Sequence, residues 1–254
     1  MKLNYPLTQK GLYILKKDDY DDIATDFLRE YLPSALERPQ AVDIDFLATE
    51  CLFLDIKEAH ITVEKSILGM IAFGETEVEC YNLAYKPEVM RLQEGTMLID
   101  VCLRGEENRP RQRFTKAHEV GHWIDHRTYH SPDKRRYEFR ANPLVVCRSN
   151  QVERYSYNAN IKTPEEWMEL QADKTAASIL MPKEPFLEEC RSAMRWAGLS
   201  TRCLIVGEHK SQSRAAIERI ADTFEVSKKA TQIRMKQLGL IMTSEQYYNE
   251  WCSI

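Results

Sequence analysis

The sequence lacks any apolar run long enough to cross a membrane. A membrane-spanning helix needs ~20 consecutive apolar residues, and the longest candidates, residues 67–73 and 97–103, are much shorter. The N-terminus also lacks the continuous apolar stretch and the small-residue cleavage site of a secretory signal. We therefore expect a soluble protein with no membrane partner that stays in the cytoplasm.

Paired cysteines are missing as well. The seven cysteines are odd in number and widely spaced, and no Cys-x-x-Cys occurs. This pattern indicates free thiols in a reducing compartment, and it argues against a disulfide framework or a cysteine-type zinc site.

The chain also has no excess of basic charge. Its formal net charge is -4, so its overall field gives nucleic acid no advantage as a partner.

The composition that remains is ordinary for a globular protein. The chain has 254 residues, 43% hydrophobic and 29% charged, enough for one large domain or a main domain with a small appendage. Hydrophobic periodicity predicts an α+β fold with helices packed on a small mixed sheet. Helices are expected at residues 21–32, 43–54, 108–127 and 163–181, and strands at 59–63, 67–73, 78–84, 96–103 and 144–147. We divide the chain into a main domain, residues 1–205, and a helical unit, residues 206–254.

The strongest chemical signal is the run His118-Glu119-Val120-Gly121-His122. In a helix, residues four apart lie on one face, so both imidazoles can reach one metal ion from the same side. Neutral imidazole suits zinc, although manganese or cobalt could occupy the same ligands. Glu119 can take a proton from a water molecule at the metal and deliver it to a leaving amine. The alternative is two solvated histidines on a surface helix, and the amphipathic context of the motif argues against it.

A catalytic zinc site needs a third protein ligand and one open position for water. One common arrangement would place a histidine where this chain has Thr128, so it fails here. The other takes a glutamate from a later helix, where Glu169 and Asp173 share a face with small alanines that permit close packing. We therefore predict Glu169 as the third ligand and Asp173 as a hydrogen-bond acceptor for a ligand histidine. Glu165 and Glu166 compete with Glu169, but Glu166 already belongs to a predicted capping box.

Three segments together carry a family resemblance: residues 114–122, residues 169–182 with their Leu-Met-Pro helix ending, and residues 41–48. In combination they are similar to the ImmA/IrrE family of zinc-dependent peptidases. The resemblance implies a zincin-like core of the gluzincin type, with zinc bound by His118, His122 and Glu169. It also implies Glu119 as the general base of a zinc metallopeptidase.

The resemblance further implies a substrate class. Members of the family typically cleave a helix-turn-helix transcriptional repressor and so derepress a mobile element or a stress response. The long stretch between His122 and Glu169 departs from the shorter members of the family. Residues 133–136 and 150–160 lie in this insert, which bears on substrate access.

A substrate peptide is expected to add in extended form to the sheet edge near residues 97–103 and so present its carbonyl to the metal. An additional donor should stabilise the oxyanion. The candidates by nearness in sequence are His126, Tyr129, His130 and Tyr137, and the sequence does not choose among them. His126 lies one turn past His122 on the same face, so a packed or supporting role is an alternative for it.

The C-terminal unit has the outline of a helix-turn-helix. Residues 213–224 form the first predicted helix, and Ser227 caps a second one that ends near Gly239. Four basic residues favour DNA contact by the second helix: Lys228, Lys229, Arg234 and Lys236. We favour the alternative, a small bundle that packs on the main domain or holds a substrate repressor, because the chain is acidic and the basic run is short.

Two functions therefore compete. The leading one is a zinc-dependent endopeptidase that acts on a repressor. The other is a DNA-binding regulator or toxin–antitoxin component whose zinc site is not catalytic. A closed structural site would have four protein ligands and no need for Glu119, so the motif favours the peptidase.

Overall fold

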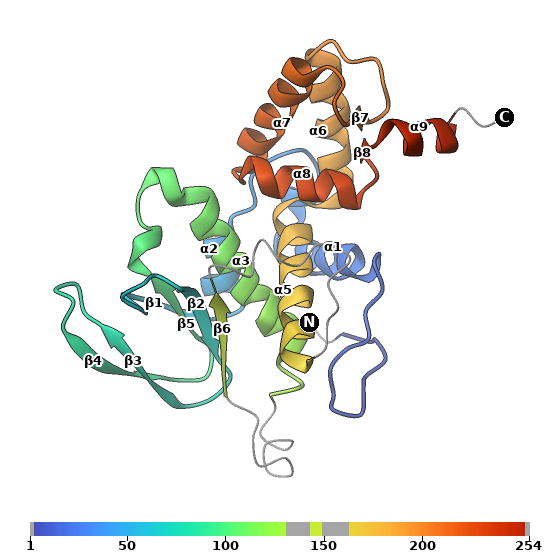
Figure 1. Cartoon of the computed structure of the whole chain (residues 1–254). Helices are drawn as coiled ribbons and strands as arrows, with labels where there is room; N and C mark the ends of the chain where they lie inside the picture. The colour runs from blue at the N-terminus through green and yellow to red at the C-terminus, as the bar shows by residue number, and fades with distance from the viewer. Residues whose placement is uncertain (1–2, 131–142, 149–162, 252–254) are drawn as a thin grey trace.

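The computed structural model describes residues 3–130, 143–148 and 163–251, which form an α+β protein (Figure 1). This confirms the predicted fold class. The insert segments 133–136 and 150–160, and with them Tyr137, lie outside the described residues. Within the described ranges, no helix combines the length and the apolar character that a membrane span requires.

Two predicted helical segments open the chain. The first is α1 (Asp19–Tyr31), which buries Ile23, Phe27 and Leu28 and is followed by the short 3-10 helix η1 (Pro33–Leu36). The second begins at α2 (Ile44–Phe46) and continues as the π-helical turn η2 (Leu47–Cys51). The Asp43 carboxylate caps α2 by accepting a hydrogen bond from the Phe46 backbone N–H, which removes one unsatisfied donor at the helix start.

The main sheet has four strands in the order β1-β5-β2-β6. These are β1 (Asp55–Ala59), β2 (Ile67–Ala72), β5 (Thr96–Asp100) and β6 (Leu144–Arg148). β1 runs parallel to β5, whereas the pairs β2–β5 and β2–β6 are antiparallel. A separate hairpin, β3 (Thr76–Tyr81) and β4 (Pro87–Leu92), extends from the sheet (Figure 1).

Three expectations about the strands were wrong. In place of the strand predicted at residues 59–63, the strand β1 lies earlier and ends at Ala59, and His60 forms only an isolated bridge with Tyr81. The predicted strands do not include β4, because proline is disfavoured inside a strand, yet it is tolerated as the first residue of one, as Pro87 is here. The predicted docking edge near residues 97–103 is not an edge. β5 pairs with β1 on one side and β2 on the other, and the chain after it forms the 3-10 helix η3 (Val101–Leu103).

Two crossing helices connect the sheet to the rest of the molecule. The short turn η4 (Glu106–Asn108) leads into α3 (Arg109–His126), which packs against β2, β5 and β6. α5 (Pro164–Leu180) packs between α3 and α1 (Figure 1). The predicted capping box is present, since Thr163 and Glu166 each bond the backbone N–H of the other.

The last part of the chain is helical and sits on the same core. It comprises α6 (Lys183–Trp196), β7 (Leu204–Ile205), α7 (Lys210–Phe224), α8 (Lys228–Gln237), β8 (Ile241–Met242) and α9 (Ser244–Trp251). The predicted turn is present, with Glu225 in the left-handed region at φ 50° and Ser227 capping α8. The assignment of α7 and α8 as a DNA-type helix-turn-helix stays a prediction, as does the domain boundary at residue 205.

Candidate metal centre

The histidines of the motif lie on one buried face of α3. His118 and His122 stand one turn apart, and their exposed fractions are 1% and 0%. Their Nε2 atoms are 2.9 Å apart, so the two ring nitrogens point at the same small volume. This arrangement excludes two solvated histidines on a surface helix.

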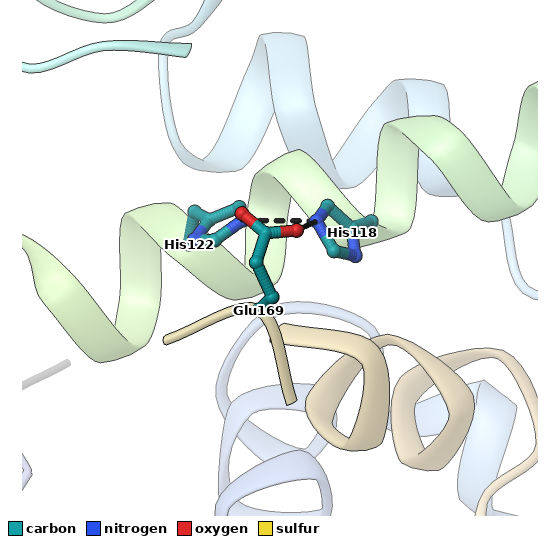
Figure 2. Close-up of side chains that lie close together, drawn as sticks. All are labelled: His118, His122 and Glu169. Atoms are coloured by element: carbon teal, nitrogen blue, oxygen red, sulfur yellow. Dashed lines mark hydrogen bonds and ion pairs between the residues drawn. The ribbon is translucent and has the colours of Figure 1, made fainter. Parts of the chain in front are cut away.

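Glu169 reaches the same volume from α5. Its Oε2 lies 3.3 Å from His118 Nε2, and its Oε1 lies 3.4 Å from His122 Nε2 (Figure 2). One ligand atom from each of the three residues falls within 4.8 Å of the others. Two imidazole nitrogens and a carboxylate oxygen are a donor set that suits a divalent transition metal.

The competing glutamates do not reach this cluster. Glu165 is exposed in the first turn of α5, and Glu166 is held in the capping box with Thr163. Glu169 differs from them because it comes one turn later, where α5 has reached the face of α3 and its side chain is buried.

Asp173 supports His118 from behind. Its Oδ1 lies 2.8 Å from His118 Nδ1, the ring nitrogen that faces away from Glu169. A carboxylate at this position fixes the proton on Nδ1 and leaves Nε2 as the ligand atom. The sequence predicted this contact from the spacing of Glu169 and Asp173 on one helix face.

His122 has a different supporting group. Its Nδ1 lies 3.0 Å from His126 Nδ1, and His126 Nε2 lies 3.1 Å from Gln171 Oε1. The Gln171 amide then donates to the backbone carbonyl of Tyr13 over 2.8 Å. The sequence offered a supporting role for His126 only as an alternative and gave no signal for Gln171, because its partners come from segments far apart in the chain.

The protonation states agree with metal ligation. Burial lowers the pKa of His122, so the imidazole is neutral as a ligand must be. Burial alone would raise the pKa of Glu169, but the imidazoles of His122 and His118 that face it outweigh this effect and hold the pKa well below its usual range. The cluster therefore offers a neutral His122 ring and an ionised Glu169 carboxylate.

Glu119 lies next to the ligand cluster. It is fully buried, and within the described part of the chain neither of its carboxylate oxygens has a hydrogen-bond partner. Gly69 on β2 makes room for it, since a Cβ there would lie 2.9 Å from Glu119 Oε1. Burial raises the pKa of Glu119 to about 8, with His118 lowering it and Glu169 raising it.

These observations fit a bound metal with its water. Glu169 Oε2 and both oxygens of Glu119 are buried acceptors that the described protein groups leave without hydrogen bonds, and such atoms are rare unless an ion or water satisfies them. His118, His122 and Glu169 would hold the ion, and Glu119 would face the water.

The residues proposed to stabilise the oxyanion have other contacts. His126 is bonded to His122 and Gln171. His130 stacks on Phe73 with ring centroids 4.4 Å apart, and Tyr129 meets the edge of His130. The structure does not bring these three into the ligand cluster, and Tyr137 lies outside the described residues.

The fold and the cluster define a class: an α+β protein whose crossing helices hold two histidines and a glutamate in a metallopeptidase-type arrangement. A peptidase family model described as the IrrE N-terminal-like domain matches residues 100–236, more than half of the chain. The chain belongs to this family, as the sequence resemblance predicted. The matched stretch contains α3 and α5 and thus every residue of the cluster. A comparison with curated proteins finds no match.

Proposed function

We propose that this protein is a zinc-dependent endopeptidase of the cytoplasm. The observation that carries the proposal is the convergence of His118, His122 and Glu169, beside a Glu119 carboxylate that no described group hydrogen-bonds. A structural zinc site would not require a buried carboxylate that binds no protein group. Cys51, Cys80, Cys102 and Cys190 are free thiols, which suits a reducing compartment.

Zinc in this cluster would polarise the scissile carbonyl and acidify a water molecule. Glu119 would act as the general base that takes a proton from a water molecule and passes it to the leaving amine. His118 and His122 each have a hydrogen-bond partner at the second ring nitrogen, which orients the ring and leaves Nε2 for the metal. Manganese or cobalt would suit the same ligands, and the two imidazoles make zinc the first expectation.

The substrate is proposed to be a helix-turn-helix transcriptional repressor, cleaved to derepress a mobile element or a stress response. The support for this is the family membership and the earlier resemblance to ImmA/IrrE peptidases. An extended peptide requires a strand edge close to α3. Among the described strands, β6 pairs on one side only and contacts α3, so it replaces β5 as the proposed docking edge.

The assignment is tested with Glu119→Gln and Glu169→Ala. We expect Glu119→Gln to keep about one zinc per chain, because it removes no ligand, and to lose cleavage by roughly 10²–10⁴-fold. Glu169→Ala should lose most of the metal. The measurements are zinc content by elemental analysis and cleavage of a repressor encoded beside this protein. Full cleavage by the Glu119→Gln variant would contradict the mechanism.

The competing function, DNA binding by α8, has less support. Arg234 is buried against Asp21 of α1, and Lys228 is paired with Glu218. Arg234 and Lys228 thus have acidic partners within the chain. Nanomolar binding to duplex DNA at physiological salt, together with no proteolysis, would favour this second function over the first.

A further inference from the structure

Three hydrogen bonds link Tyr13, Gln171, His126 and His122 in series, and the backbone carbonyl of Tyr13 fixes which group donates in each. Tyr13 O can only accept, so the Gln171 side chain must turn its amide nitrogen toward it, 2.8 Å away. The amide oxygen of Gln171 therefore faces His126 Nε2 at 3.1 Å. An oxygen can only accept there, so Nε2 of His126 carries a proton.

The same reasoning continues to the metal ligand. A neutral His126 that carries its proton on Nε2 has an acceptor at Nδ1. That nitrogen lies 3.0 Å from His122 Nδ1, which must then be the donor. With its proton on Nδ1, His122 presents a lone pair at Nε2, the atom that lies 3.4 Å from Glu169.

We propose that His126 and Gln171 are positioning residues that fix the proton of His122 on Nδ1 and so keep its Nε2 open for the metal. This inference rests on the metal site of the proposed function and adds two residues that do not touch the metal. The two ligand histidines would be oriented by unlike means. An Asp173 carboxylate supports His118, whereas a neutral imidazole and an amide support His122.

We call this series of hydrogen bonds, from the Tyr13 carbonyl through Gln171 and His126 to His122, the relay. It begins in the N-terminal segment. Tyr13 is itself buried, bridges to Leu7, and places its hydroxyl 3.4 Å from Thr128 at the end of α3. Its carbonyl is therefore held in place when it meets Gln171. His126 and Gln171 are both fully buried, so water cannot substitute for a lost partner.

Three variants of the full chain test the proposal through zinc affinity, measured by competition with a chelator. His126→Phe keeps the ring shape but removes the acceptor, and we expect zinc binding to weaken by about 10–100-fold. His126→Asn places an amide oxygen near the position of Nδ1, and its affinity should lie within a few-fold of the wild type. Gln171→Met removes the acceptor for His126 and should also weaken zinc binding.

Thr175→Val is the matched control. Thr175 is fully buried on α5 and donates to Asp125 of α3 over 2.6 Å, so its loss weakens the same helix pair without touching the relay. We expect this variant to lose stability and keep its zinc affinity. Equal zinc affinity for His126→Phe and the wild type would overturn the proposal, and so would an equal loss in His126→Phe and His126→Asn.

A second readout needs no metal. Long-range ¹⁵N NMR of histidine in the metal-free wild type should show the proton of His126 on Nε2 and that of His122 on Nδ1. The opposite tautomer of His126 would overturn the relay. If the wild type has these tautomers but binds no zinc, the proposed function fails while the hydrogen-bond relay stands.

Discussion

Three carboxyl groups are buried on α3 and α5, and each has different neighbours. Glu169 faces two imidazoles, Glu119 faces no described hydrogen-bond donor, and Asp125 accepts one bond from Thr175. The pKa of each carboxyl group is lower where more neighbouring groups stabilise its charged form. The pKa of Glu169 lies well below the usual range, and burial raises that of Asp125 to about 7.

Asp125, which is not part of the ligand cluster, makes the stability of the folded protein depend on pH. Its pKa rises from 3.8 in the unfolded chain to about 7 in the folded one, mainly by burial and despite the Thr175 hydrogen bond. The folded protein therefore favours the protonated carboxyl, and stability declines as the pH rises between these two values. Asp125→Asn should lack this decline.

The comparison is made by urea unfolding of the two proteins at pH 4.5 and pH 7.5. Each pKa unit corresponds to ~1.4 kcal/mol, so the variant should gain a few kcal/mol over the wild type between the two values. Other titrating groups are common to both proteins and cancel in the difference. A difference in free energy of unfolding that is the same at both pH values would contradict a raised pKa.

At the scale of the elements, the close approach of α3 and α5 determines whether Glu169 reaches the two histidines. A Cβ on Gly121 would lie 2.9 Å from the carbonyl oxygen of Ala172 and 3.2 Å from its Cα. Both atoms belong to the backbone of α5, so no side-chain rotation can relieve the contact. Glycine in α3 and alanine in α5 thus set the helix separation at which Glu169 reaches the two histidines.

Gly121→Ala should therefore destabilise the protein. Helix propensity alone would stabilise an alanine variant by ~1 kcal/mol, whereas overpacking against a backbone costs ~1–3 kcal/mol. We expect a net loss in urea unfolding, together with weaker zinc binding because α5 is displaced from α3. A variant with a higher free energy of unfolding than the wild type would show that the two helices are not in close contact.

At the scale of the whole molecule, the C-terminal helices are joined to the first helix by a buried ion pair. Arg234 of α8 pairs with Asp21 of α1, and the exposed fractions of the two side chains are 4% and 9%. Asp21 also accepts a hydrogen bond from Ser178 of α5. α8 thus closes against α1, which packs on α5, the helix that carries Glu169, and its basic character is partly used inside the chain.

Removing one partner of this pair should be costly. Arg234→Met leaves Asp21 buried without its counterion, and we expect a loss of ~3–5 kcal/mol in the free energy of unfolding. Lys228→Met is the matched control on the same helix, because Lys228 and Glu218 are 53% and 41% exposed and such pairs contribute about 0–1 kcal/mol. Equal losses for the two variants would show that the buried pair does not hold α8 in place.

The sequence determined most of the helices, the strands β2, β3, β5 and β6, and the chemistry of the centre, because these depend on local patterns. The spacing of His118 and His122 fixes a common face in any α-helix, and the Thr163 capping box fixes the start of α5. Helical spacing likewise placed Asp173 with Glu169 on one face. Where local rules are ambiguous the prediction failed, as at Pro87, which begins a strand, and at residues 59–63.

Only the tertiary structure decided which segments meet. Strand order depends on pairings between distant residues, so the sequence did not reveal that β5 lies inside the sheet. The approach of Ala172 to Gly121, and the contact of Tyr13 with Gln171, also join residues that no local period relates. Local periodicity assigned the ligand atoms to helix faces. The packing of α5 and of the N-terminal segment on α3 brought those faces together and set the hydrogen bonds behind them.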